Sequence, residues 1–191
     1  VTIEEKKGAE IVEQDEEPFK TNFDKIPTLK PAFLKDGTVT AANASKINDG
    51  AAALTVMSKE EAQRRGLTPL ARIVSYASFA KKPEWFTTAP ADVIAKTLAR
   101  ASMTVQQIDL FEINEAFAVV TLAVNQAAKL DPATVNVNGG AVAMGHPIGA
   151  SGARILVTLL SALRQRNARM GMAAICIGGG EASGMIVERI V

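Results

Sequence analysis

The sequence predicts an α/β layered domain. Short apolar segments typical of strands alternate along the chain with segments whose apolar residues recur at helical spacing. The clearest helix lies around residues 155–163, where isoleucine and leucine form one apolar stripe and arginines lie off it. A compact apolar segment at 172–177 predicts a strand after that helix.

The first 47 residues differ from the rest of the chain. Residues 1–17 are dense in glutamate and lysine, and Pro18, Pro27 and Pro31 interrupt the stretch that follows. Proline lacks an amide donor and restrains the residue before it. We therefore expect extended segments and loops here rather than a sustained helix.

The first elements of the layered part lie between residues 50 and 66. Residues 50–57 are small and apolar, which favours a buried strand, with a helix as the alternative. Ser58 and Glu61 have the spacing of a capping box, in which the serine caps the glutamate amide and the carboxylate reaches back. Gly66 then supplies a helix stop.

A regular alternation follows. Residues 71–76 predict a strand, and Pro90 suits the first turn of a helix that ends near Ala101. Residues 104–107 form a second capping-box pattern. The remaining predicted elements are a strand, a helix and a closing strand, at residues 108–113, 116–129 and 185–191.

Composition excludes several classes of protein. The 191 residues carry 21 basic and 20 acidic side chains, so no overall field favours nucleic acid or an anionic membrane. No apolar run is long enough to span a bilayer, and no signal peptide is recognisable. The chain starts at Val1 in a polar stretch, so we expect a processed or cut terminus. A lone cysteine rules out an internal disulfide and a cysteine-rich metal site, and favours a reducing compartment.

Three segments carry residues suited to chemistry, and we expect each beyond the carboxyl end of a strand, where α/β sheets bind ligands. One contains the only histidine, His146, in a loop dense in glycine and stiffened by Pro147. Such a loop would hold one imidazole in a fixed pose for acid–base or oxyanion chemistry, and we favour this over a structural histidine. The glycine spacing fits neither a dinucleotide fingerprint nor a Walker loop.

The other two segments are less specific when taken alone. Cys176 precedes three glycines, whose free amides could bind a developing negative charge, but a buried structural cysteine fits equally well. Asn114 stands where a predicted strand meets a helix, a place where asparagine is usually just a cap.

Together, these segments resemble the C-terminal half of the thiolases, the family of acetyl-CoA acetyltransferases and 3-ketoacyl-CoA thiolases. The resemblance rests on Asn-Glu-Ala-Phe at 114–117, Gly-His-Pro at 145–147 and Cys-x-Gly-Gly-Gly at 176–180. It extends to residues 37–45 and 48–52 and so covers nearly the whole chain.

The resemblance implies a place for each part of the chain. In that family two similar α/β halves form a five-layer αβαβα domain, with an inserted loop region that helps to hold coenzyme A. Residues 1–47 would then be the end of the loop region, and residues 48–67 the last strand and helix of the first half. Residues 68–191 would be the C-terminal thiolase domain.

It also implies an activity, the reversible Claisen condensation of acetyl-CoA to acetoacetyl-CoA, or thiolysis of a 3-ketoacyl-CoA. Cys176 would be the acid/base, and His146 would activate a nucleophilic cysteine of the other half. Asn114 would orient a water in the oxyanion hole, and the Gly178 amide would belong to a second hole. Residues implied to line the coenzyme A channel are Ser45, Ala41, Phe33 and Phe117.

The resemblance further implies coenzyme A thioesters as substrates, without a metal or other cofactor. The expected partners are the complementary N-terminal half and further copies in a dimer or tetramer, in the cytoplasm or an organellar matrix. Alternatives are a degradative 3-ketoacyl-CoA thiolase for longer chains and a non-catalytic half-chain that binds coenzyme A. Without the other half, residues 1–191 should not turn over.

Overall fold

A mixed four-stranded sheet lies between two layers of helices. The computed structural model describes residues 1–6 and 8–190. The strand order is β3-β6-β5-β4, with β4 and β5 parallel and the other neighbours antiparallel. The strands are β3 (Ala71–Ala80), β4 (Leu110–Ile113), β5 (Met170–Cys176) and β6 (Glu181–Arg189). The α/β class predicted from the sequence is therefore confirmed.

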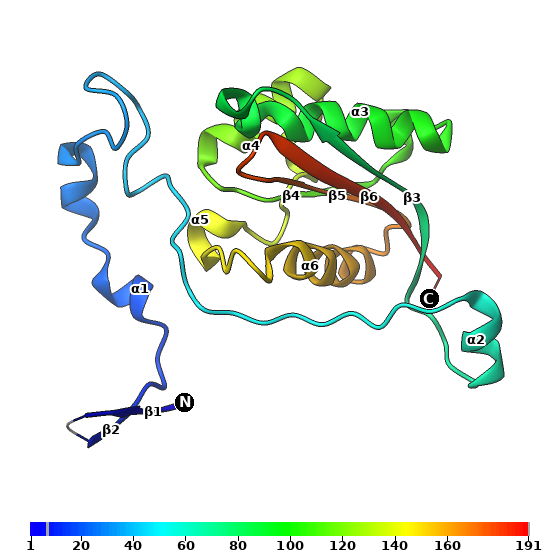
Figure 1. Ribbon diagram of the computed structural model, residues 1–191, viewed down its shortest axis with the longest axis horizontal. Coiled ribbons are helices and arrows are strands. Elements are labelled where there is room, and N and C mark those ends of the chain that lie inside the picture. Colours follow the sequence, from blue (N-terminus) through cyan, green and yellow to red (C-terminus); the bar gives the residue numbers. More distant parts are fainter. Residues whose placement is uncertain (7, 191) are drawn as a thin grey trace.

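The helices cover both faces of this sheet, as Figure 1 shows. Helices α3 (Ala89–Ala101) and α4 (Ala118–Ala128) pack on one face, and α6 (Ser151–Gln165) packs on the other. The strands contribute side chains to an apolar core on each face of the sheet, because successive side chains of a strand point to opposite faces. Phe111 and Ile113 of β4 pack with α3 and α4, whereas Leu110 packs with α6.

The leucine stripe of α6 forms the second core, as its spacing predicted. Ile155, Leu159 and Leu163 are at most 2% exposed and pack against Ala173 and Val187 of the sheet. Burial of each such side chain contributes roughly 1.5–3 kcal/mol. This packing fixes the first turn of α6 relative to the ends of β4 and β5, where the candidate site lies.

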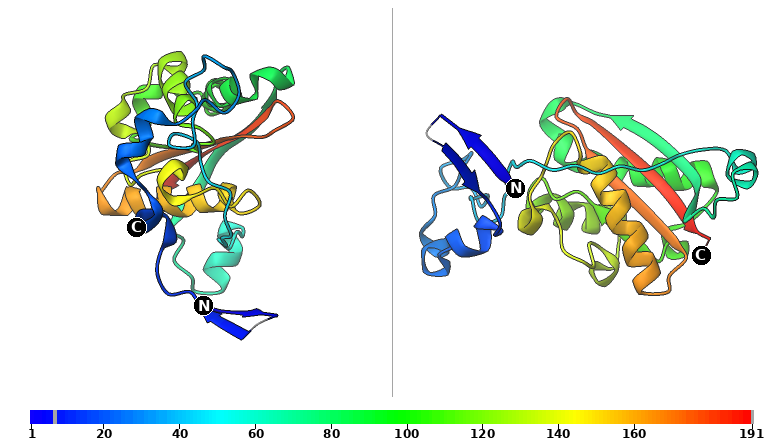
Figure 2. Two further views of the ribbon diagram at one scale, coloured as in Figure 1. Left: turned by 90° about the vertical axis from the view of Figure 1, so that its left-hand side faces the viewer. Right: turned by 90° about the horizontal axis from the view of Figure 1, so that it is seen from below.

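The N-terminal segment lies to one side of the layered domain (Figure 2). It contains a hairpin, a short helix and a 3₁₀ helix, so it is more ordered than the loops we predicted. Asp15 and Asn22 accept hydrogen bonds from amides in the first turns of these helices, which stabilises short helices although each contains a proline. These elements are β1 (Thr2–Glu5), β2 (Gly8–Ile11), α1 (Glu16–Lys20), which contains Pro18, and the 3₁₀ helix Phe23–Thr28, which contains Pro27.

The strand predicted at residues 50–57 is wrong. This segment is an extended, mostly exposed coil that leads to α2 (Lys59–Arg64). A strand needs a neighbour to pair its amides and carbonyls, and in the described part of the chain this segment has none. Ser58 does cap the Glu61 amide at 3.2 Å, but the Glu61 carboxylate binds Arg64 and Arg65 instead of reaching back.

Strands β3 and β6 are longer than predicted. They pair antiparallel from Ala71 with Arg189 to Ala80 with Glu181, so each extends the other beyond its most apolar part. The prediction of a helix from Pro90 to Ala101 is confirmed by α3, and the second capping box is present at Thr104 and Gln107.

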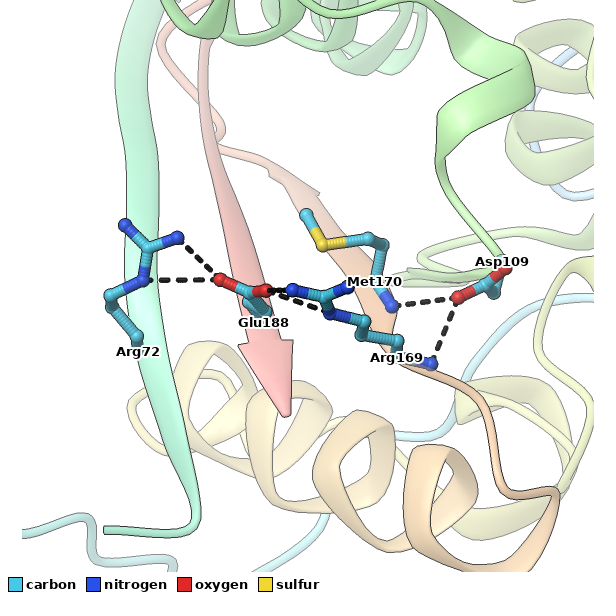
Figure 3. A network of polar contacts seen from close by, with 5 residues as sticks. All are labelled: Arg72, Asp109, Arg169, Met170 and Glu188. Atoms are coloured by element: carbon cyan, nitrogen blue, oxygen red, sulfur yellow. Dashed lines mark hydrogen bonds and ion pairs between the residues drawn. The ribbon is translucent and has the colours of Figure 1, made fainter. Parts of the chain in front are cut away.

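An ion-pair network joins the strands at one end of the sheet (Figure 3). Glu188 of β6 lies between Arg72 of β3 and Arg169 and pairs with both, which lowers the pKa of its carboxyl group. Asp109 accepts hydrogen bonds from the amides of Arg169 and Met170, at 2.9 and 2.7 Å. Because Met170 begins β5, this network lies at the opposite end of that strand from Cys176.

Within residues 1–6 and 8–190, no helix combines the length and apolar character that crossing a membrane requires.

Candidate active site

The parallel pair of strands brings Asn114 and Cys176 to the same edge of the sheet. Ile113 is paired with Ala174, and the next amide, of Asn114, donates to the Ala174 carbonyl at 3.0 Å. Cys176 is the last residue of β5, two positions beyond Ala174. Asn114 is fully buried, and Cys176 is 9% exposed. Both therefore lie at the carboxyl ends of neighbouring strands, as predicted.

His146 reaches this edge from the segment between α5 (Ala141–Met144) and α6. Its Nε2 lies 3.3 Å from Nδ2 of Asn114, and its Nδ1 lies 2.6 Å from Oγ of Ser151. Its amide donates to the Lys46 carbonyl at 2.7 Å, and this hydrogen bond ties the loop to the segment that precedes residues 50–57. The imidazole is half-buried, and burial followed by the charge of Arg154 lowers its pKa.

The loop holding His146 does not directly follow a named strand, contrary to our expectation. It follows the short helix α5, and the nearest strand-like contact before it is an isolated bridge between Val135 and Phe111. Gly145 makes the turn with φ of +89°, and a Cβ there would lie 2.4 Å from Oδ1 of Asn48. A glycine is required at this point, because other residues avoid this backbone region.

A tight turn follows Cys176. The amide of Gly180 donates to the Ile177 carbonyl at 3.2 Å, and Gly178 is exposed within this turn. Gly180 has φ of +101°, and a Cβ there would lie 2.3 Å from the Lys81 carbonyl oxygen. Burial raises the pKa of the Cys176 thiol above its usual value. The raised pKa favours the protonated form of the thiol.

The structure thus brings His146 and Asn114 into direct contact, and Cys176 ends the strand that pairs with the one preceding Asn114. In the described part of the chain, the imidazole of His146 hydrogen-bonds with Asn114 and Ser151, and the thiol of Cys176 is not among its partners. Asn114 links the two, because its side chain meets the imidazole and its backbone pairs with the strand that carries Cys176.

A buried ion pair lies beneath Asn114. Nη1 of Arg154 on α6 is 3.8 Å from Oε2 of Glu112, which is 1% exposed. Nη2 of the same arginine donates to Oδ1 of Asn114 at 3.3 Å. Burial raises the pKa of Glu112 to about 7, with Arg154 opposing the rise and Glu115 adding to it.

Glu112, Ser151 and Arg154 were not identified as site residues from the sequence. Two spacings could have indicated them. Glu112 lies on a strand two positions before Asn114, which directly follows that strand, so the two side chains are expected on the same face. Ser151 and Arg154 are three positions apart in the first turn of α6 and so lie on one side of that helix.

The residues predicted to line a coenzyme A channel gather near the start of α4. The rings of Phe33 and Phe117 pack edge to face with centroids 5.5 Å apart. The amide and hydroxyl of Ser45 both donate to the Ala116 carbonyl, at 3.0 and 2.8 Å. Ala41 is exposed in a turn closed by a hydrogen bond between residues 43 and 40. Among the described residues, no cluster of three His, Cys, Asp or Glu side chains could hold a metal ion.

The edge of the sheet thus combines an imidazole that contacts polar groups at both nitrogens, a buried thiol and exposed turn amides, which are groups suited to acid–base chemistry. The chain belongs to the thiolase family. Residues 67–189 match the family model of the thiolase C-terminal domain, and residues 1–60 match that of the thiolase N-terminal domain.

Curated relatives are similar over nearly the whole chain. A Dictyostelium discoideum protein described as a probable acetyl-CoA acetyltransferase is 55% identical over 179 residues, which is 94% of this chain and 43% of that protein. The Schizosaccharomyces pombe acetyl-CoA acetyltransferase is 49% identical over 96% of this chain and 47% of its own length. The chain therefore spans about half the length of the curated relatives it matches.

Solved structures share the fold. The Bacillus anthracis acetyl-CoA acetyltransferase superposes with a TM-score of 0.90 at 45% identity, over 99% of this chain and 48% of that one. A human mitochondrial 3-ketoacyl-CoA thiolase in complex with CoA superposes with a TM-score of 0.82 at 39% identity, over 90% and 44% respectively. The predicted family and thiolase fold are therefore confirmed.

Proposed function

We propose that this chain supplies the C-terminal half of the active site of a thiolase that reversibly condenses two acetyl-CoA molecules to acetoacetyl-CoA. The observation that carries the proposal is the contact between His146 and Asn114 at the sheet edge where Cys176 ends β5. The names of the relatives support the same substrate.

The first half-reaction transfers an acetyl group to a nucleophilic cysteine of the complementary N-terminal half. The thiol proton of that cysteine moves to Nε2 of His146, and the thiolate attacks the thioester carbonyl. The carbon–sulfur bond to coenzyme A breaks, and the departing thiolate takes the proton of Cys176. The raised pKa of Cys176 suits this role, because the residue must begin the cycle protonated.

The second half-reaction forms the carbon–carbon bond. The Cys176 thiolate removes a proton from the α-carbon of a second acetyl-CoA, and the carbanion attacks the acyl-enzyme. The nucleophilic cysteine leaves as thiolate and recovers its proton from His146. Both sulfur groups and the imidazole return to their starting protonation states, so the cycle is balanced.

Two sets of donors stabilise the oxygen anions. His146 and a water oriented by Asn114 serve the enolate, and the amide of Gly178 in the exposed turn serves the acyl-enzyme. Loss of one such donor typically slows a reaction by about two to three orders of magnitude. Phe33, Ala41, Ser45 and Phe117 border the channel for coenzyme A, whose thioesters are the substrates; no other cofactor is needed.

A degradative 3-ketoacyl-CoA thiolase is the second candidate, because the human mitochondrial enzyme of that name shares the fold at 39% identity. The two candidates differ in the acyl chain length that the whole protein prefers. Rates with acetoacetyl-CoA and with 3-ketoacyl-CoA thioesters of eight or more carbons would separate them. We expect a complete protein with two halves, assembled as a dimer or tetramer in the cytoplasm or an organellar matrix.

The test uses the whole protein that contains this chain. Cys176→Ala should abolish both condensation and the exchange of acetyl α-protons with deuterated water, while acetylation of the nucleophile is slowed much less. Arg164→Gln, an exposed change on α6, is the matched control and should leave all three rates unchanged. Retained α-proton exchange in the Cys176 variant would overturn the proposal. If the unaltered whole protein binds coenzyme A without any turnover, the non-catalytic alternative holds.

A further inference from the structure

Hydrogen bonds connect Arg154, Asn114, His146 and Ser151 in series. Because Arg154 can only donate, this series indicates which nitrogen of the His146 imidazole carries the proton. A guanidinium can only donate, so Oδ1 of Asn114 must be the atom that faces Arg154. The amide nitrogen Nδ2 therefore faces Nε2 of His146, 3.3 Å away. An amide nitrogen can only donate, which means that Nε2 presents its lone pair.

The other side of the imidazole leads to the same result. Oγ of Ser151 lies 3.0 Å from the Pro147 carbonyl, which can only accept, so the hydroxyl proton points there. With its proton directed there, Oγ is free to accept a hydrogen bond from Nδ1 of His146, 2.6 Å away. The neutral imidazole consequently carries its proton on Nδ1, and the two ends of the chain agree.

The guanidinium that begins this series of contacts is largely buried, and its charged partner is buried more completely. The side chain of Arg154 is 18% exposed and that of Glu112 is 2% exposed. Oε1 of Glu112 and Nε and Nη1 of Arg154 are buried without a hydrogen-bond partner. Buried polar atoms left in this way destabilise a fold, so the pair is a poor purely structural solution.

We propose that Arg154, which forms an ion pair with Glu112, is a positioning residue that fixes the amide orientation of Asn114 and thereby keeps Nε2 of His146 as the basic atom. The proposal rests on the proposed function, in which Nε2 takes the proton of the nucleophile. Without the guanidinium the Asn114 amide can turn over and present Oδ1 to the imidazole. That orientation favours a proton on Nε2 and removes the base.

The test variant is Glu112→Gln combined with Arg154→Met in the whole protein. The pair is changed together because Arg154→Met alone would leave a buried carboxylate unpaired. Nitrogen-15 spectra of labelled histidine report the tautomer, and the signal of His146 is identified by its loss in His146→Gln. Arg154→Lys keeps one charged donor and serves as the conservative rescue, and Arg164→Gln on the same helix is the control.

We expect the unaltered protein to show the Nδ1-protonated form. The double variant should show a mixture of tautomers and a kcat about tenfold lower, the effect of one hydrogen bond, with KM for acetyl-CoA changed less than twofold. Arg154→Lys should restore both the spectrum and most of kcat. If the double variant does not fold, the His146 spectrum of the unaltered protein and the spectrum and kcat of Arg154→Lys still test the positioning role of Arg154.

Three results would overturn the inference: an Nε2-protonated histidine in the unaltered protein, a double variant with unchanged spectrum or kcat, or an equal loss in Arg154→Lys. Failure of the proposed function gives a different pattern. In that case His146→Gln and Asn114→Ala would keep full condensation activity, whereas failure of the positioning role alone leaves those two variants inactive.

Discussion

Replacement of Glu112 by glutamine should change how the free energy of unfolding depends on pH. The carboxyl group is 1% exposed, and burial raises its pKa from 4.5 to about 7. Arg154 on α6 opposes this rise, and Glu115, three residues further along the chain, adds to it. Glutamine has nearly the same shape and no proton to lose, so it removes the titration while keeping the packing.

The sign and size follow from proton linkage. Between pH 4.5 and about 7 the folded protein holds the Glu112 proton and the unfolded chain has released it. Folding is therefore weakened as pH rises through this range, and the full penalty is present above pH 7. At about 1.36 kcal/mol for each pH unit, the carboxylate destabilises the fold by about 3 kcal/mol at pH 8 relative to pH 4.

Urea unfolding of the whole protein at several pH values between 4.5 and 8 would measure this effect. The free energy of unfolding of Glu112→Gln minus that of the unaltered protein should rise with pH by about 3 kcal/mol. Exposed Glu84→Gln is the control and should give a flat difference. Parallel curves for the Glu112 variant and the unaltered protein would refute the argument, whatever the constant offset between them.

Three further predictions test the packing around the site. Gly180→Ala should lower the free energy of unfolding, measured in urea, by about 1–3 kcal/mol, because Gly180 has φ of +101° and a Cβ would lie 2.3 Å from a main-chain oxygen. Gly149→Ala is the control and should not have this effect, because a Cβ there would enter open space. Cys176 should react with iodoacetamide more slowly than free cysteine at pH 8, as followed by peptide mass spectrometry, because burial raises its pKa and leaves less of the reactive thiolate. Labelling as fast as that of free cysteine would contradict this. Leu159→Ala should cost about 2–5 kcal/mol and half-exposed Val157→Ala under about 1, so equal losses would be inconsistent with the α6 core.

The elements that could be predicted from the sequence are those whose signals are local. The leucine stripe of α6 and the proline near the start of α3 mark helices by spacing and by backbone chemistry alone. The segment at 50–57 shows the limit of such signals. Its apolar residues indicate burial, but a strand also needs a pairing partner, and the described chain offers it none.

The residues of the candidate site also divide into those with a local sequence signal and those without one. His146, Asn114 and Cys176 stand out in the sequence because each lies in an unusual local context of glycines or at a strand end. Arg154 does not, because an arginine on an amphipathic helix is ordinarily a solvated residue. Its role depends on the packing of α6 against β4, which brings its guanidinium to within 3.3 Å of the Asn114 oxygen.

The ion pairs at the two ends of the sheet differ in their exposure to water. The two arginines that pair with Glu188 have side chains more than 60% exposed, so they stay hydrated and their network joins the strands at little cost. Glu112 and Arg154 lie inside, where a pair of charges is usually less stable than apolar side chains of similar size. The fold therefore contains this destabilising pair at the end of the sheet where Asn114 and Cys176 lie. A destabilising ion pair at this end of the sheet is expected if Arg154 is needed to position Asn114. Replacement of Glu112 and Arg154 by uncharged side chains should then raise the free energy of unfolding and lower kcat.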